Sequence, residues 1–348
     1  MIAATISSDC DFRVEDVSVP GIADNEILLK VRAASICGTD TKIINNGHGK
    51  LAPGRKIILG HEFVGVIEQC GRDIDCFKVG QRVGVAPNIG CGQCEECIRG
   101  LANMCPHYSA FGIDMDGGHT EFVRIPSAAI MQGNVVELPE HVSFEEAALA
   151  EPFSCVLNGQ RGLRIEAGDT VLVCGAGPIG IMHIMLAGVS GAANIIAADI
   201  NDARLEMARM AGANITCNSM KGNLRDVVMS HTKNRGANAI ITACPVPEAQ
   251  EQSLEMAAPY GRICFFGGLK KDSPFIRINS NLIHYRNLVI TGSTGGSPHD
   301  YRRALALIAS GRISPRAVIS QTYDISQIAD AYKAAQNPSN LKIVLCNN

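Results

Sequence analysis

The chain has 348 residues, of which 46% are hydrophobic and 19% charged, and its formal net charge is -3. This composition is typical of a globular protein and excludes a disordered or collagen-like chain, and the length suits two domains. Without a basic cluster we expect no nucleic-acid partner. No apolar run reaches the roughly 18 residues of a membrane span, so we expect no membrane partner. The first ten residues lack the pattern of a secretory signal, which favours the cytoplasm.

The first 150 residues or so contain many short apolar segments separated by glycine and proline, and few long helical periods. The expected strands include 26–33, 63–69, 82–86 and 120–125. Short strands with turn residues between them predict a β-rich barrel or sandwich.

From about residue 168 the pattern changes, and expected strands alternate with expected helices. The strands are 170–174, 194–199, 238–244 and 261–268, and the helices are 181–188, 203–212 and 248–258. This alternation predicts a parallel sheet with crossover helices. A helix near 301–311 and a strand near 342–345 are expected after it.

A glycine-rich motif, GAGPIG (residues 175–180), follows the first of these strands and precedes a helix; it includes Gly175, Gly177, Pro178, Ile179 and Gly180. In that context the glycines allow a tight turn, close approach of backbone to a pyrophosphate, and helix packing on the strand. The helix N-terminus attracts phosphate.

An acidic residue, Asp199, ends the next strand, where its carboxylate can accept the ribose hydroxyls of NAD and would repel the 2′-phosphate of NADP. Arg204 either contacts the ribose or is a solvated helix residue. A glycine turn with a solvated aspartate is the alternative, but the order of elements favours an NAD site.

Four of the fourteen cysteines lie within fifteen residues: Cys91, Cys94, Cys97 and Cys105. Four thiolates this close can enclose one ion in a closed tetrahedral site, with zinc the natural choice and an iron–sulfur cluster the rival. The absence of an open position favours a structural metal. The other cysteines are scattered, which favours a reducing compartment over a disulfide framework.

A third motif joins Cys37-Gly38-Thr39-Asp40 with the later Gly60-His61-Glu62. Cysteine and histidine can hold a catalytic zinc that keeps a position for water or substrate. These two residues alone do not distinguish such a site from a buried cysteine and a core histidine.

Taken together, CGTD, GHEFVG, the cysteine loop, Glu151-Pro152 and GAGPIG occur in the order found in the zinc-containing medium-chain alcohol dehydrogenases. The chain resembles this family over nearly its whole length, most closely its polyol (sorbitol-type), threonine and sugar-alcohol phosphate dehydrogenases. The resemblance implies an α/β fold with a GroES-like β-rich catalytic domain (1–152), a Rossmann NAD-binding domain (153–290) with a doubly wound parallel sheet, and a segment (291–348) that completes the catalytic domain. It also implies an active site in the cleft.

The resemblance also implies roles for single residues. Cys37, His61, Glu62 and Glu151 match positions around the catalytic zinc, and the two glutamates are direct ligands in only some members. Thr39 matches the hydroxyl that relays the substrate proton, and the four clustered cysteines match the ligands of a structural zinc. The implied cofactors are therefore two zinc ions per chain and NAD, the substrate a small-molecule alcohol, and the assembly a homodimer or homotetramer.

Three positions depart from the family's patterns. Lys42 stands where many relatives carry a histidine of the proton relay; since a protonated lysine is a poor proton acceptor, we expect it to bind the ribose or a substrate anion. Residues 291–298 lack the arginine of animal sorbitol dehydrogenases, and Asn88 replaces a histidine of threonine dehydrogenases.

A polyol or sugar alcohol, phosphorylated or not, is the substrate we expect. The alternatives are a threonine-type enzyme, a non-catalytic NAD-binding zinc protein and a zinc-free quinone reductase.

Overall fold

The computed structural model describes residues 1–347, which form two compact units. Unit 1 comprises Met1–Ser154 together with the segment from Gly296 onward, and unit 2 comprises Cys155–Gly295. The boundaries predicted at 152 and 290 differ from these by a few residues. The first lies inside helix α5 (Ala150–Arg161) and the second inside strand β16 (Val289–Gly292).

Unit 1 is rich in β-structure. Its largest sheet has seven strands in the order β10-β6-β5-β3-β18-β17, with β9 also paired to β3; a three-stranded sheet has the order β2-β1-β4, and β7 pairs with β8. The strands are β1 (Ile2–Ser7), β2 (Phe12–Asp16), β3 (Ile27–Ser35), β4 (Lys56–Ile58), β5 (Glu62–Cys70), β6 (Arg82–Val85), β7 (Asn88–Ile89), β8 (Ser109–Ala110), β9 (Phe122–Ile125), β10 (Val135–Glu137), β17 (Ile319–Asp324) and β18 (Lys342–Cys346).

Short helices cover and connect these sheets. They are α1 (Gly38–Asn46), α2 (Glu95–Ile98), α3 (Ser127–Met131), α4 (Phe144–Ala148), α11 (Pro298–Ala309) and α12 (Ile328–Ala335), with 3₁₀ turns at Ala102–Met104, Pro315–Val318 and Ile325–Gln327.

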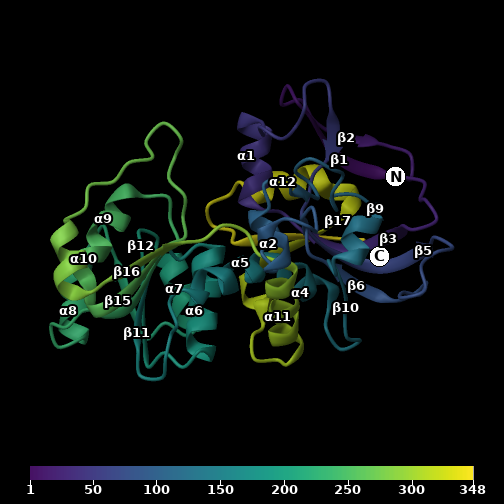
Figure 1. Ribbon diagram of the computed structural model, residues 1–348. Helices are drawn as coiled ribbons and strands as arrows, with labels where there is room; N and C mark the ends of the chain where they lie inside the picture. Colours follow the sequence, from purple (N-terminus) through teal and green to yellow (C-terminus); the bar gives the residue numbers. More distant parts are fainter. Residues whose placement is uncertain (348) are drawn as a thin grey trace. The chain divides into compact units, whose positions relative to one another are not determined.

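The C-terminal segment is an integral part of unit 1. Strand β18 pairs antiparallel with β3, so that Leu345 lies opposite Ala34, and β17 pairs with β18 on its other side; Figure 1 shows the yellow β17 among the purple and blue elements of unit 1. One buried core contains residues from both ends of the chain, such as Ile6, Ile328 and Leu345. Burial of these apolar side chains stabilises the pairing of the last segment with the β-rich unit.

Unit 2 is a six-stranded parallel sheet with the strand order β13-β12-β11-β14-β15-β16, the order of a doubly wound nucleotide-binding sheet. Its strands are β11 (Thr170–Cys174), β12 (Asn194–Asp199), β13 (Ile215–Asn218), β14 (Ala237–Thr242), β15 (Ala257–Phe265) and β16. Its helices are α6 (Pro178–Val189), α7 (Asp202–Met210), α8 (Leu224–His231), α9 (Pro247–Met256) and α10 (Ser280–Arg286), besides part of α5. Every residue of β11 is buried, as expected for the central strand of a parallel sheet.

The expected helix 248–258 was too long at its C-terminal end. Helix α9 ends at Met256, because Ala257 already belongs to β15, where it pairs with Ala237 of β14. Alanine is compatible with a helix or a strand, so the pairing with a neighbouring strand determines the conformation of Ala257. The elements β13, α8, α10 and β16 were not predicted.

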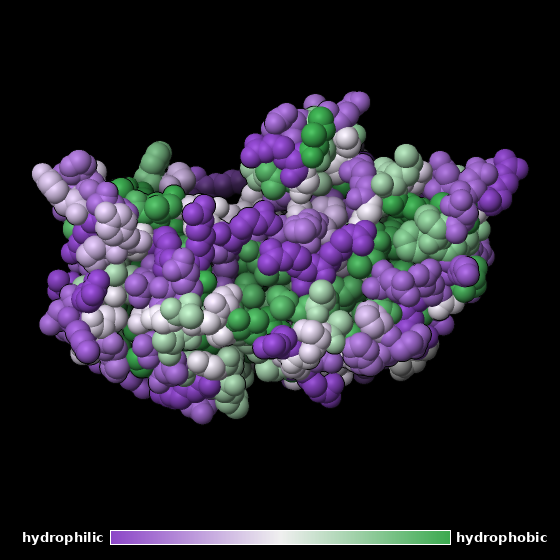
Figure 2. Space-filling view, turned by 60° about the horizontal axis from the view of Figure 1, so that its bottom comes forward, coloured by the Kyte–Doolittle hydropathy of each residue, from purple (hydrophilic) through white to green (hydrophobic). Residues whose placement is uncertain are grey.

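Within residues 1–347 no helix combines the length and the apolarity that a membrane crossing requires. Polar residues cover most of the face shown in Figure 2, and apolar residues form separate patches between them.

Candidate functional site

Cys37 is placed by the turn between β3 and α1. It is the N-cap residue of α1, and its backbone N–H donates to Oδ2 of Asp40 at 2.8 Å. Asp40 is the third residue of the helix, from which an acidic side chain can reach back to the N-cap. This arrangement holds the cysteine at the end of β3 and buries Asp40 completely.

His61 and Glu62 lie at the start of β5, whose first residue pairs with the last residue of β3, Ser35. The pairing brings them next to Cys37: the sulfur of Cys37, a ring nitrogen of His61 and a carboxylate oxygen of Glu62 all lie within 4.8 Å of one another. Three of the four predicted catalytic ligands are thus together, although 24 residues separate Cys37 from His61 in the sequence.

Asp40 orients His61, because its Oδ1 lies 3.4 Å from Nδ1 of that ring. Burial alone would raise the pKa of Asp40, but the facing histidine outweighs it and lowers the pKa to about 2. Burial opposes protonation of His61 as well, yet Asp40 and Cys37 raise its pKa well above the usual value. A proton on Nδ1 faces the carboxylate, so Nε2 is the nitrogen left for a metal, as in carboxylate–histidine–zinc arrangements.

The two carboxylate oxygens of Glu62 have different surroundings. Oε2 accepts from the Ser35 hydroxyl and from Nζ of Lys342, whereas Oε1 is buried and has no hydrogen-bond partner among the described residues. Buried acceptors are nearly always satisfied, so an unpaired carboxylate oxygen beside a thiol and an imidazole fits a metal cation.

Lys342 comes from β18 and is itself buried. Its Nζ also donates to the carbonyl oxygen of Ile36 at 3.1 Å. Burial would lower the pKa of Lys342, but the charges of Glu62 and Cys37 outweigh it and raise the pKa above its usual value. Neither Lys342 nor the role of Asp40 was predicted from the sequence.

The other predicted residues of this region lie around the cluster. Glu151 is buried in the first turn of α5, outside the set formed by Cys37, His61 and Glu62, and its charge contributes to the raised pKa of Lys342. Thr39 is half-buried in the first turn of α1, and Lys42 is exposed on the same helix. Asn88 donates from Nδ2 to the carbonyl oxygen of Gly296 at 3.1 Å.

The four clustered cysteines form a second group whose sulfur atoms all lie within 4.8 Å of one another: Cys91, Cys94, Cys97 and Cys105. The backbone N–H groups of Cys91 and His107 donate to Sγ of Cys105 at 3.3 and 3.4 Å. Hydrogen bonds from the backbone of Gln93 and Cys94 lower the pKa of Cys91 to about 6. Donors aimed at sulfur stabilise thiolates, so this group fits a closed tetrahedral metal site.

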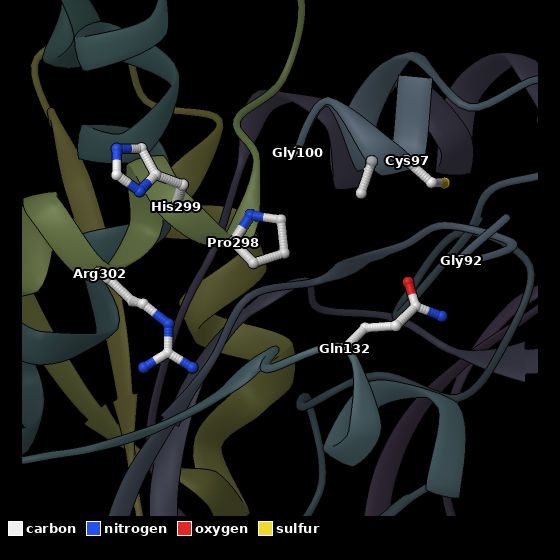
Figure 3. Close-up of a pocket in the computed structure, with 8 residues that line it drawn as sticks. Gly92, Cys97, Gly100, Gln132, Pro298, His299 and Arg302 are labelled. Atoms are coloured by element: carbon white, nitrogen blue, oxygen red, sulfur yellow. The ribbon is translucent and has the colours of Figure 1, made fainter. Parts of the chain in front are cut away.

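A cavity of about 360 Å³ lies beside this loop. Pro298, His299 and Arg302 of α11 line one side, and in Figure 3 the sulfur of Cys97 points away from them. Arg302 donates to the carbonyl oxygen of Gly133 at 2.8 Å. Cys97 thus lines part of the cavity, with its sulfur turned away from the α11 side.

In unit 2 the three motif glycines have three different environments. Gly175 has a φ of 100°, which favours glycine, and a Cβ on Gly180 would lie 1.8 Å from the carbonyl oxygen of Gly175. Gly177 is the N-cap of α6, where no side chain caps the helix and no atom lies within 4 Å of the place of a Cβ. Its backbone is therefore open to an anion at the N-terminus of a 12-residue helix.

Asp199 is fixed beside this turn. Its Oδ2 accepts the N–H of Ala176 at 2.7 Å, and its Oδ1 accepts the N–H of Asn201 at 2.9 Å. Each oxygen keeps a second lone pair, so the carboxylate can still accept from a sugar hydroxyl. Arg204 is half-buried in the first turn of α7.

Comparison with known proteins gives matches over the whole chain. Residues 23–140 match the family model "Alcohol dehydrogenase GroES-like domain", and residues 178–310 match "Zinc-binding dehydrogenase". The chain is 30% identical to sorbitol dehydrogenase of Bacillus subtilis, over 100% of this chain and 98% of that protein. It is 32% identical to L-threonine 3-dehydrogenase of Bacillus licheniformis, over 95% and 94%. The crystal structure of the alcohol dehydrogenase RspB of Escherichia coli CFT073, complexed with NADH, is 29% identical, has a TM-score of 0.89 and covers 99% of both chains.

Proposed function

The chain belongs to the zinc-containing medium-chain alcohol dehydrogenases, and we propose that it transfers a hydride from the secondary alcohol of a polyol or sugar alcohol to NAD. The family consists of oxidoreductases that act on CH–OH groups. The observation that carries the proposal is the group formed by the half-buried Cys37 with the buried His61 and Glu62, in which one carboxylate oxygen of Glu62 has no partner among residues 1–347.

In this proposal Cys37, His61 and Glu62 hold the catalytic zinc, with Glu151 close to them. A zinc ion there would polarise the alcohol oxygen and lower its pKa. Asp40 keeps the proton of His61 on Nδ1, and Thr39 passes the substrate proton outward. Cys91, Cys94, Cys97 and Cys105 hold a second zinc with no open position, whose role is structural.

For the cofactor, the backbone at Gly177 and the start of α6 receive the pyrophosphate, with Gly175 and Gly180 shaping the turn and Pro178 and Ile179 forming the first residues of the helix. Asp199 accepts the ribose hydroxyls and disfavours NADP, with Arg204 nearby. NAD supplies the hydride acceptor.

We also propose a homodimer or homotetramer that uses the edge of the unit 2 sheet. Strand β16 is the last strand in the sheet order, and an unpaired strand edge can pair with a second chain. Apolar side chains in this strand and in the helix just before it are exposed: 49% of Val289 and 77% of Tyr285. The cytoplasm is proposed as the location, because the cysteines of residues 1–347 form no disulfide, which suits a reducing compartment.

The test is NADH formation with a panel of polyols, their phosphates and threonine, with and without a metal chelator. The proposal expects turnover of one class of polyol or sugar alcohol that the chelator abolishes. Turnover of threonine alone would replace the proposed substrate with an amino alcohol. Bound NAD with no turnover of any alcohol would point to the non-catalytic alternative.

A further inference from the structure

A lysine from the C-terminal segment, Lys342, lies beside Glu62. It is 4% exposed, and its Nζ lies between Oε2 of Glu62 and the carbonyl oxygen of Ile36. A lysine is almost never buried unless it is paired, so a specific interaction holds it in this position.

The side-chain hydrogen bonds of Glu62 all go to one of its two carboxylate oxygens. Ser35 and Lys342 both donate to Oε2, and Oε1 has no partner within the described residues. Two donors on a single oxygen fix the orientation of the carboxylate and leave Oε1 unpaired, and a carboxylate oxygen of Glu62 lies within 4.8 Å of the ligand atoms of Cys37 and His61. A carboxylate held in this way can give a metal one oxygen but not both.

We propose that Lys342 is a positioning residue that restrains Glu62 as a metal ligand, so that the catalytic zinc keeps an open position for the alcohol. The inference rests on the proposed function, because it takes the group of Cys37, His61 and Glu62 as the zinc site. The ammonium of Lys342 shares the negative charge of the carboxylate through Oε2 and keeps that oxygen away from the metal.

Removal of the lysine has two effects on metal binding, and both act in the same direction. A carboxylate without its ammonium partner is a stronger donor, and its Oε2, no longer held by the lysine, is free to approach the metal. Both strengthen metal binding and favour a second carboxylate contact. A lysine with a merely structural role would have the opposite effect, because a loosened site loses its metal faster.

The experiment measures metal release to a chelator from the intact holoenzyme, together with the visible absorption of the cobalt-substituted protein. The variants are Lys342→Met, which removes the charge at similar length, and Lys342→Arg, which keeps it. We expect release from Lys342→Met to be slower by roughly tenfold, the usual scale for residues that support metal ligands. The cobalt absorption should weaken as the coordination number rises, and Lys342→Arg should remain near the wild type.

If Lys342→Met alone does not fold, the comparison is made between Glu62→Gln and the double variant, in which no buried carboxylate loses its partner. In a Glu62→Gln background, adding Lys342→Met should leave metal release unchanged, because the lysine acts through the carboxylate. Faster release from Lys342→Met, or a change in release within the Glu62→Gln background, would overturn the inference.

The proposed function is tested separately by Cys37→Ser in the same assay. If the wild-type protein holds no metal that Cys37→Ser removes, the site itself is wrong and both proposals fail. If that metal is present but Lys342→Met does not slow its release, only the role of Lys342 fails.

Discussion

The two units build their candidate sites from different parts of the chain. In unit 1 side chains from β3, α1, β5 and β18 converge, and several of them are buried ionisable groups. In unit 2 the glycine turn and Asp199 lie within one consecutive strand–helix–strand segment, and the contacts are largely backbone N–H groups. A site made of converging side chains depends on each residue's chemistry, whereas a backbone site depends on turn geometry. Substitutions should therefore act differently in the two units.

The largest effect is expected in unit 1. Cys37→Ala removes a proposed zinc ligand, so kcat/KM should fall by about 10⁴-fold or more, close to 5 kcal/mol of transition-state stabilisation. Steady-state kinetics and metal analysis measure the loss. Cys10→Ala, which changes a cysteine outside both metal groups, is the matched control. Equal activity of the two variants would mean that the converging site is not the catalytic one.

A substitution in the group of four cysteines should instead affect the stability of unit 1. Cys94→Ala should release one zinc and destabilise unit 1 by on the order of 4 kcal/mol, because the binding free energy of a structural metal becomes folding free energy. Denaturant unfolding with metal analysis tests this, with the exposed Cys76→Ala as control. Retention of both zinc ions in Cys94→Ala would contradict the closed four-cysteine site.

A smaller effect is expected in unit 2. Asp199→Gly should weaken NAD binding by about 2–3 kcal/mol, the range for hydrogen bonds to a charged group, and should improve the use of NADP. Cofactor titrations of this variant and of Asp202→Asn, an exposed aspartate of the following helix, separate the proposed role from a general charge effect. A cofactor preference unchanged by Asp199→Gly would exclude ribose recognition by this residue.

The smallest effect concerns stability away from both sites. His183 of α6 is buried, and burial lowers its pKa to about 3. Since this lies below the unfolded value of 6.5, the histidine contributes stability above pH 6.5, and that contribution is lost as the pH falls toward 3. At pH 5 the loss should be about 2 kcal/mol. Urea unfolding at pH 5 and above pH 6.5 should show a weaker pH dependence of stability in His183→Gln than in the wild type. His231→Gln, on the exposed end of α8, should behave like the wild type.

The sequence predicted unit 2 well because its signals are local. The strand β11, the glycine turn and Asp199 follow one another along the chain, and their spacing alone indicates a nucleotide site. What it missed, such as β13 and β16, are four-residue strands whose identity depends on a neighbouring strand. Ala257 shows the same limit, since pairing with β14 moved it from the expected helix into β15.

In unit 1 the sequence alone left Cys37 and His61 ambiguous, and only the family resemblance assigned them to zinc. The role of Lys342 could not be predicted, because its partner Glu62 lies 280 residues away and the strand around the lysine is apolar. Asp40 was within the CGTD motif, but its role depends on helix α1 placing it opposite the ring of His61. Such contacts follow from the tertiary fold and have no local pattern.

Metal content tests the central claim most directly. Native mass spectrometry of the wild-type protein and of Cys37→Ser counts the zinc ions per chain. We expect two in the wild type and one in the variant, with the remaining zinc held by the four cysteines. One zinc in the wild type, or two in Cys37→Ser, would contradict a zinc site at Cys37, His61 and Glu62.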